Sequence, residues 1–304
     1  MTHPAIRAAR ALGWSSTFVP VGEGRIHLVR QGRGVPLLVL HGWPEFWLTW
    51  RPLIERVADR CECLAPDLRG FGATGKWEPE PSSGIGPEVH ARHLVDLLDR
   101  LGIDRVLLVG HDVGAYVAQA MARLAPERLL GIFLMDCPHP GIGARWAAPR
   151  QIAEIWYQSF NQQPFAALLV GASRATCRAY LGHFLRHWAH RKDVFEADLE
   201  LWVDVFLEPG NLEGGFDWYR SIAPARLAAI EGCAPALPPI DVPTRVLWGR
   251  HDPILRAAWA DTLPATFRDL ELGFAENSGH FPHREEPEVV AATLRAFLDR
   301  LGLR

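Results

Sequence analysis

The motif Gly-His-Asp-Val-Gly at residues 110–114 constrains the fold of this chain more than any other feature of its sequence. It stands between a short apolar segment, residues 105–109, and a helical pattern over residues 115–124. Two glycines around a central residue are typical of a sharp strand-to-helix turn, because that residue is strained and its neighbours are crowded. We therefore expect the side chain of Asp112 to project from the end of a strand, over the start of a helix.

Short apolar segments bounded by Gly, Pro and Asp alternate with longer helical patterns along the chain. This alternation is typical of βα units around a mostly parallel sheet. An early pair of segments, separated by a Gly-Glu-Gly turn, predicts an antiparallel hairpin at the sheet edge. The fold class is therefore α/β, with a mostly parallel eight-stranded sheet flanked by helices. The strands are predicted at 16–21, 25–31, 35–40, 61–66, 105–109, 129–135, 244–248 and 269–274, and the clearest helices at 87–101, 115–124 and 288–301.

The alternation stops between residues 135 and 244, where about a hundred residues are rich in Trp, His, Arg and Gln. We interpret residues 141–225 as a helical cap subdomain inserted over the sheet. The core would then consist of residues 1–140 and 226–304. We find no internal repeat and no low-complexity linker in the sequence.

The charge balance favours a small, apolar or amphiphilic substrate. Lys plus Arg number 32 against 35 Asp plus Glu, a net charge of -3 that gives no electrostatic footprint for nucleic acid or an anionic membrane. The N-terminus lacks a secretory apolar region, and no segment approaches the roughly 18 apolar residues that span a bilayer. We therefore expect a cytoplasmic protein, and the sequence leaves a homodimer open.

Asp112 has the chemistry of a nucleophile as well as the position of one. A carboxyl with an ordinary pKa of about 3.9 is anionic near neutrality and needs no base for its first attack. Such a carboxylate suits substitution at a saturated carbon that carries a leaving oxygen or halogen. The alternative is an ordinary βα turn in which the aspartate only caps the helix.

Near the C-terminus, His280 follows the predicted strand at 269–274 and precedes the last helix. Its ordinary pKa near 6.5 lets it act as a general base at cellular pH. Two acids at strand ends could orient it, Asp252 and Asp136. The chain order Asp112, Asp252, His280 matches the order of nucleophile, acid and histidine expected after such a turn, which favours Asp252.

The loop His-Gly-Trp-Pro at residues 41–44 follows the predicted strand at 35–40. Backbone N–H groups of Trp43 and Val113 could together stabilise the oxyanion that forms when an ester on Asp112 is hydrolysed. The alternative is a Gly- and Pro-containing loop with no part in catalysis.

These motifs together resemble the aspartate-nucleophile branch of the α/β-hydrolase superfamily, which contains epoxide hydrolases, haloalkane dehalogenases and fluoroacetate dehalogenases. The resemblance extends along the whole core and implies both the fold and the nucleophile class. The segments that carry it are HGWP (41–44), DLRGFGATG (67–75), GHDVG (110–114), GRHDP (249–253) and SGHFPHREEP (278–287).

The cap distinguishes the members of this branch. Epoxide hydrolases use two cap tyrosines that hydrogen-bond the epoxide oxygen, and Tyr157 and Tyr219 lie in segments similar to those of that family. A phenol can donate a hydrogen bond, and then a proton, to an emerging alkoxide. The alternative for both tyrosines is aromatic packing in a Trp-rich cap.

Other positions depart from the dehalogenases. Fluoroacetate dehalogenases bind the substrate carboxylate with two arginines where this chain has Val113 and Tyr116, and they have His and Trp where it has Tyr157 and Gln158. Without that pair of cations a haloacid would be poorly held. Haloalkane dehalogenases, and many epoxide hydrolases, have tryptophan at the position of Val113, so Val113 disfavours halide binding more than it disfavours epoxide opening. The cap pattern of fluoroacetate dehalogenases is otherwise similar to that of this chain and includes a tryptophan like Trp188.

The resemblance therefore predicts an epoxide hydrolase that forms vicinal diols, with no cofactor and no metal. Candidate substrate-binding residues are Trp188, Asp136 and His111. His183, His187 and His190 could in principle hold a metal, but no HExxH pattern or carboxylate accompanies them. A dehalogenase with the same nucleophile is the first alternative, and a non-catalytic ligand-binding protein on the same scaffold is the second.

Overall fold

The computed structural model describes residues 2–77 and 85–304 and contains an eight-stranded sheet with the order β1-β2-β4-β3-β5-β6-β7-β8. β2 is antiparallel to both β1 and β4, and the remaining neighbours are parallel. The predicted fold class is thus confirmed, including the hairpin at the edge. The strands are β1 (Ser15–Val21), β2 (Gly24–Gly32), β3 (Val35–Leu40), β4 (Cys61–Pro66), β5 (Val106–His111), β6 (Leu129–Met135), β7 (Thr244–Gly249) and β8 (Leu270–Ala275).

The central strands are almost entirely buried because helices cover both faces of the sheet. All six residues of β5 are buried, and the register pairs Leu37 with Leu107 and Val39 with Val109. A parallel sheet buried on both sides gives continuous apolar segments rather than alternating ones, which is why these strands were predictable. β5 continues two residues beyond its predicted end and includes His111, so Asp112 follows the strand directly.

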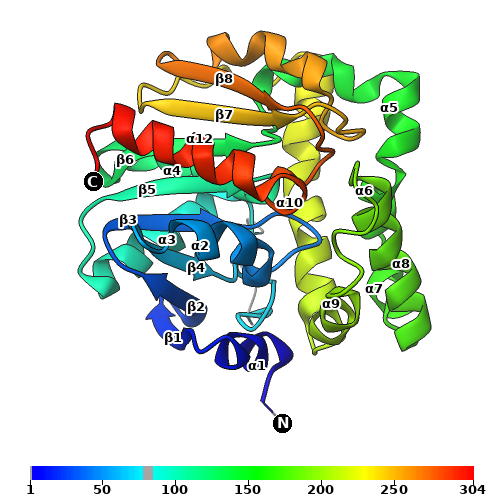
Figure 1. The fold of residues 1–304 in the computed structure, drawn as a ribbon. Helices are drawn as coiled ribbons and strands as arrows, with labels where there is room; N and C mark the ends of the chain where they lie inside the picture. Colours follow the sequence, from blue (N-terminus) through cyan, green and yellow to red (C-terminus); the bar gives the residue numbers. More distant parts are fainter. Residues whose placement is uncertain (1, 78–84) are drawn as a thin grey trace.

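Helices of the core pack against the sheet in pairs, α2 against α12 and α3 against α4. α3 has its predicted bounds, whereas α4 begins at Val113, two residues early. Figure 1 shows α12, in red, crossing the face of the sheet that is nearer to the viewer. The helices are α1 (Pro4–Ala11), η1 (Trp47–Trp50), α2 (Arg51–Val57), α3 (Pro87–Leu101), α4 (Val113–Leu124), η2 (Pro126–Arg128), η4 (Ala257–Ala265), α11 (Pro282–Glu285) and α12 (Pro287–Arg300).

The segment between β6 and β7 is helical. In Figure 1 its green helices stand beside the ends of the strands, and α10, in yellow, runs between them and the strands. α10 passes through Pro224 and ends at Glu231, so the predicted boundary at residue 225 falls inside a helix. The division into core and cap stays a prediction. The helices are η3 (Pro140–Ala147), α5 (Pro149–Glu154), α6 (Trp156–Asn161), α7 (Ala166–Val170), α8 (Arg174–His187), α9 (Leu199–Phe206) and α10 (Asn211–Glu231).

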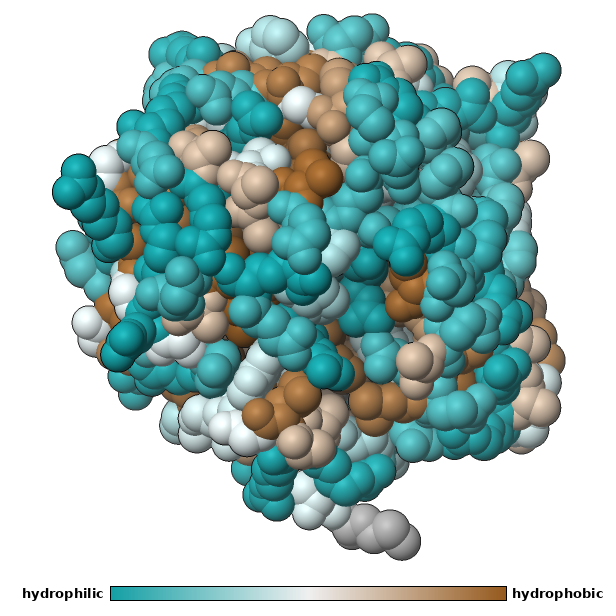
Figure 2. All heavy atoms as spheres, in the orientation of Figure 1, coloured by the Kyte–Doolittle hydropathy of each residue, from teal (hydrophilic) through white to brown (hydrophobic). Residues whose placement is uncertain are grey.

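The surface in Figure 2 is largely hydrophilic, with apolar patches scattered between charged side chains. Within residues 2–77 and 85–304, no helix combines the length and the apolar character that crossing a membrane requires.

Candidate active site

Asp112 occupies a strained turn between β5 and α4. Its φ of 46° lies in the left-handed region that favours glycine. A Cβ on Gly110 would lie 2.6 Å from the carbonyl oxygen of Gly114, and one on Gly114 would collide with the carbonyl oxygen of Leu40. Both glycines are therefore required by close approach of the backbone. The half-buried Asp112 side chain makes no capping hydrogen bond to α4, which argues against the simple helix-cap alternative.

The loop after β3 holds the Asp112 carboxylate from the other side. The backbone N–H of Trp43 donates to Asp112 Oδ2 at 3.1 Å. Gly42 permits this approach, because a Cβ there would lie 2.8 Å from the Cβ of Asp112. Val113 is the first residue of α4, directly after the nucleophile. The N–H of Trp43, one of the two predicted oxyanion donors, therefore bonds to the carboxylate of Asp112 itself. The role of both N–H groups in stabilising an oxyanion stays a prediction.

His280 follows β8 and bonds to Asp252, which follows β7. His280 Nδ1 lies 2.7 Å from Asp252 Oδ2, while Asp252 Oδ1 accepts from the backbone N–H groups of Ile254 at 2.7 Å and Leu255 at 2.9 Å. The carboxylate is therefore fixed by three bonds. The other imidazole nitrogen, Nε2, is buried and has no hydrogen-bond partner in the part of the chain that the structure describes. In the neutral form of His280, this nitrogen could take a proton from a water molecule.

The charge state of His280 depends on neighbouring carboxylates. Burial lowers the pKa of His280, but the negative charges of Asp252 and Asp112 outweigh burial and raise the pKa from 6.5 to about 9. At neutral pH the resting site therefore contains an imidazolium beside an anionic nucleophile.

Asp136 lies next to this pair and does not bond to His280. Its Oδ1 accepts from the backbone N–H of Gly249 at 3.0 Å, and a ligand atom of each of Asp136, Asp252 and His280 lies within 4.8 Å of the others. Burial, followed by the negative charge of Asp252, raises the pKa of Asp136 well above its usual range. The geometry favours Asp252 as the orienting acid. Asp136 Oδ2 is buried and has no hydrogen-bond partner among the described residues, so contact of Asp136 with substrate stays a prediction.

The hydrogen bonds of His111 give no support to the prediction that it binds substrate. His111 Nδ1 lies 2.8 Å from Glu45 Oε2, and His111 Nε2 lies 2.7 Å from the backbone carbonyl oxygen of His280. With both ring nitrogens engaged and the ring fully buried, His111 has no polar atom left for a ligand. It connects the turn that carries the nucleophile to the loop that carries the histidine.

The sequence reasoning missed Glu45, which binds two histidines at once. Its Oε1 lies 2.9 Å from His283 Nε2, Thr49 donates to the same oxygen, and Gly42 N–H donates to Oε2 at 3.0 Å. We call Glu45, Thr49, His111 and His283 the Glu45 cluster. Burial raises the pKa of Glu45, but the two histidines outweigh it and hold that pKa well below its usual range. A carboxylate directly after the HGWP loop was the available signal.

Aromatic stacking brings both predicted cap tyrosines next to Trp43. The rings of Trp43 and Tyr157 stack at 5.4 Å with an interplanar angle of 4°. Tyr219 meets Trp43 edge-on at 5.5 Å, and the two tyrosine rings are 5.5 Å apart. Burial raises the pKa of each phenol, and the charge of Asp112 acts in the same direction. Two protonated phenols therefore lie beside the residue whose backbone binds the nucleophile.

Trp188, another predicted substrate contact, packs against both His280 and Trp43. Its ring lies 5.2 Å from that of His280 and 5.6 Å from that of Trp43. The indole N–H groups of Trp43 and Trp188 are buried without an acceptor among the described residues. A ligand could satisfy either donor, so contact of Trp188 with substrate stays a prediction.

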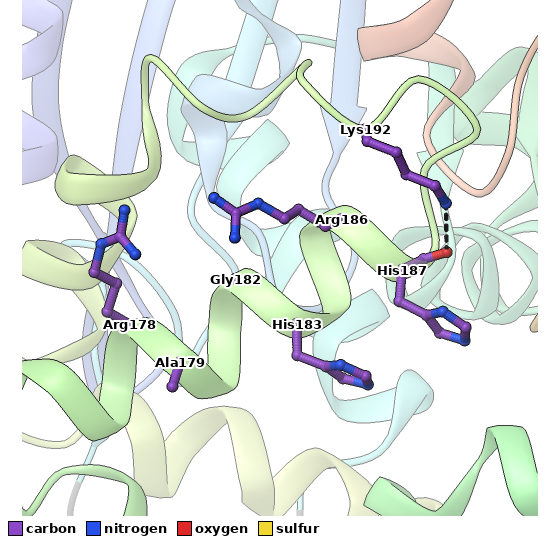
Figure 3. A pocket seen from close by; sticks show the side chains of 7 residues that line it. All are labelled: Arg178, Ala179, Gly182, His183, Arg186, His187 and Lys192. Atoms are coloured by element: carbon purple, nitrogen blue, oxygen red, sulfur yellow. Dashed lines mark hydrogen bonds between the residues drawn. The ribbon is translucent and has the colours of Figure 1, made fainter.

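The three cap histidines weighed as metal ligands do not converge. Figure 3 shows His183 and His187 side by side at a surface hollow of about 430 Å³ along α8. Their rings stack at 5.3 Å, and His187 Nε2 bonds Glu154 at 2.7 Å, whereas His190 stacks on His251. Among the residues that the structure describes, two buried groups have three ligand atoms in reach of one ion: Asp136 with Asp252 and His280, and Glu45 with His111 and His283. Members of both groups already hydrogen-bond one another.

Comparison with known proteins agrees with this geometry. Residues 35–287 match the family described as the alpha/beta hydrolase fold. The soluble epoxide hydrolase of Corynebacterium sp. (strain C12) is 31% identical over 282 residues, covering 90% of this chain and 93% of that protein. Haloalkane dehalogenase 2 of Mycobacterium bovis is 28% identical over 303 residues, covering 95% and 96%. The structure of epoxide hydrolase CorEH without ligand has a TM-score of 0.81 at 29% identity, covering 95% of this chain and 99% of that one.

The chain therefore belongs to the α/β-hydrolase fold family. Within that family, its similarity to proteins named epoxide hydrolase makes it an epoxide hydrolase-like enzyme.

Proposed function

We propose that this enzyme hydrolyses epoxides to vicinal diols through a covalent ester on Asp112. The observation that carries the proposal is the position of Asp112, strained at the turn and held by the N–H of Trp43, whose ring packs against Tyr157 and Tyr219. A carboxylate oxygen attacks one epoxide carbon and forms a carbon–oxygen ester bond. The bond from that carbon to the epoxide oxygen breaks, and its electron pair goes to the oxygen.

The cap tyrosines stabilise the oxygen as it leaves. Both phenols are protonated, since burial raises the pKa of each. One phenol donates a hydrogen bond to the epoxide oxygen, and the proton of Tyr157 passes to the developing alkoxide. The product of this half-reaction is a hydroxyalkyl ester of Asp112 and a phenolate at Tyr157.

Ester formation also prepares the second half-reaction. Esterified Asp112 has lost its negative charge, which is one of the charges that raise the pKa of His280. The pKa of His280 therefore falls, and the imidazolium releases its proton to solvent, so that neutral His280 becomes available as a base. Asp252 orients it, and its Nε2 deprotonates a water that attacks the ester carbonyl carbon. The N–H groups of Trp43 and Val113 stabilise the resulting oxyanion.

Collapse of this intermediate releases the diol and restores the enzyme. The departing alkoxide takes the proton from His280, and the acid proton of Asp112 returns to the phenolate of Tyr157. His280 then regains from solvent the proton that it released, so one water and one epoxide are consumed and the cycle balances without a cofactor. A small apolar or amphiphilic epoxide suits the aromatic side chains that surround Trp43.

The experiment that tests this proposal is intact-protein mass spectrometry of the His280→Ala variant with a panel of epoxides. Hydrolysis should stall, so the protein should gain the mass of one epoxide on Asp112. Wild-type protein turning over in ¹⁸O-water should incorporate the label into the same side chain. An unmodified His280→Ala protein across a panel on which wild type is active would overturn the mechanism.

A dehalogenase reaction is the second candidate, because two buried indole N–H groups, those of Trp43 and Trp188, have no acceptor among the described residues. Such donors could bind a leaving halide. Incubating the wild type with haloalkanes and haloacids and measuring halide release separates this reaction from diol formation. Halide release without turnover of any epoxide would favour the second candidate.

A further inference from the structure

Arg226, on α10, is a half-buried cation next to the cap tyrosines with no carboxylate in ion-pair distance among the described residues. Its guanidinium donates to Gln158 Oε1 and, at 3.0 Å, to the hydroxyl of Tyr116. It also lies over the ring of Trp146, 4.0 Å from the centroid. A cation placed this way is held by neutral groups only, so its charge is not cancelled by a neighbouring anion.

The guanidinium determines how Gln158 is oriented. Arginine can only donate, so the amide oxygen of Gln158 must face it. The amide nitrogen then faces the other way and donates to the hydroxyl oxygen of Tyr157 at 3.1 Å. Arg226, Gln158 and Tyr157 therefore form a chain of hydrogen bonds with one direction.

The direction of these hydrogen bonds determines what the O–H of Tyr157 can do. The phenol oxygen accepts from Gln158, so its own O–H remains available to a third group. When that proton leaves, the negative charge on the phenol oxygen is stabilised by the Gln158 N–H, which the Arg226 cation polarises. Burial raises the pKa of Tyr157, while the bond from Gln158 and the charge of Arg226 act in the opposite direction.

We propose that Arg226 and Gln158 are positioning residues that activate Tyr157 as the proton donor during opening of the epoxide. The inference rests on the proposed function and deepens it, because it adds two residues that support Tyr157 only while the epoxide ring opens. Arg226 does not contact the reacting atoms. It acts through Gln158, and it makes Tyr157 the stronger donor of the two cap phenols.

The test measures alkylation alone, in protein that also carries His280→Ala. In this background the ester accumulates, so the growth of the adduct mass with time gives the rate constant of ring opening. Gln158→Leu and Arg226→Met should each lower this rate constant by roughly tenfold, the effect of losing one charge-assisted hydrogen bond. In otherwise wild-type protein, the rate of ester hydrolysis after a burst should stay unchanged.

Arg220→Met is the matched control, because Arg220 lies on the same helix but binds Asp217 and the backbone carbonyls of Gln162 and Gln163. It should change the alkylation rate by no more than roughly twofold, as for a substitution outside the chain of bonds. Thermal unfolding of each variant shows whether the fold is retained.

Two further measurements separate activation of Tyr157 from a structural effect. The double variant Gln158→Leu with Arg226→Met should be no slower than the slower single variant, since both residues act through one chain. Epoxides whose leaving alkoxide is weakly basic, such as a trifluoromethyl oxirane, need less proton donation. The loss in Arg226→Met should therefore shrink on such substrates.

The adduct measurement distinguishes failure of the ester mechanism from failure of the role proposed for Arg226 and Gln158. If His280→Ala protein never gains an adduct, the ester mechanism is wrong. If it gains the adduct and Arg226→Met and Gln158→Leu react as fast as their parent, the mechanism stands and the activating role of Arg226 is overturned. Equal losses for all epoxides, with matching losses in ester hydrolysis, would also overturn it.

Discussion

Two buried clusters of carboxylates and imidazoles lie close together in this enzyme and have opposite properties. The pair Asp252 and His280 has an imidazole nitrogen without a partner among the described residues, and the pKa of that histidine is raised to about 9. In the Glu45 cluster, burial lowers the pKa of His283 to about 4. The same residue types therefore give one charged and one neutral imidazole at neutral pH.

The difference comes from how many anions each imidazole faces. His280 lies near two carboxylates in addition to Glu45, whereas His283 has the carboxylate of Glu45 opposed by the charges of His111 and Arg284. One of the anions at His280 is the nucleophile, which loses its charge when an ester forms. The first cluster can therefore change protonation during a reaction, while the Glu45 cluster holds the loops in place.

The largest change in activity is expected from replacing the two histidines in turn. His280→Gln should lower steady-state turnover of epoxide by roughly 10³-fold or more, because it removes the general base. His283→Gln should keep turnover within roughly tenfold, since a glutamine N–H can still donate to Glu45. Diol formation measured on matched protein concentrations checks both. Equal losses in the two variants would show that the clusters do not differ in function.

The next effect concerns stability. Glu45→Gln should lower the free energy of unfolding by about 3 kcal/mol at neutral pH, because it breaks a buried charge network. The pKa of Glu45 is depressed in the folded state, so its contribution is present above its unfolded value of 4.5 and is lost as the pH falls through the lower folded value. Urea unfolding of wild type and variant across this acidic range should therefore show their difference shrinking.

Glu62→Gln is the control for this measurement, because Glu62 pairs with Arg30 at the surface and is partly exposed. Its loss should cost less than about 1 kcal/mol. A Glu45→Gln variant as stable as the Glu62→Gln variant would mean that the Glu45 cluster does not hold the loops together.

A smaller expected effect tests whether the charge of Asp112 controls the pKa of His280. Asp112→Asn imitates the loss of charge on ester formation, so the pKa of His280 should fall below about 9 while that of His283 stays near 4. NMR titration of protein labelled at histidine measures both, and the His280→Gln variant assigns the signal. Unchanged titration of His280 would show that the nucleophile does not control its base.

The core half of the site was predictable because strand ends and glycines carry strong local signals. The Gly-x-Asp-x-Gly turn and the loop after β3 predicted where Asp112 and Trp43 lie, and backbone contacts of Gly110 and Gly114 explain why those glycines are needed. Such features depend on residues adjacent in the chain. They can therefore be inferred without knowledge of the packing.

The cap side of the site and the two buried clusters were harder to predict, because the residues that contact one another there are far apart in the sequence. Arg226 meets Gln158 across 68 positions, and His283 meets Glu45 across 238. His111 was assigned to substrate because it neighbours the nucleophile, yet both of its nitrogens bond to protein. No local pattern indicates where a ring nitrogen points, since long-range packing decides it.

The smallest predicted effect concerns Asp136, which the sequence could not separate from Asp252 as the orienting acid. Burial, followed by the charge of Asp252, raises the pKa of Asp136 well above its usual range and favours its neutral form, and an amide of the same shape can keep the bond from the Gly249 N–H. Asp136→Asn should therefore change turnover by no more than roughly threefold, whereas Asp252→Asn removes the acceptor that orients His280. Steady-state kinetics of the two variants decides the assignment. A loss in Asp136→Asn as large as that in Asp252→Asn would mean that the reaction needs negative charge on Asp136, and the charge distribution inferred for this cluster would be wrong.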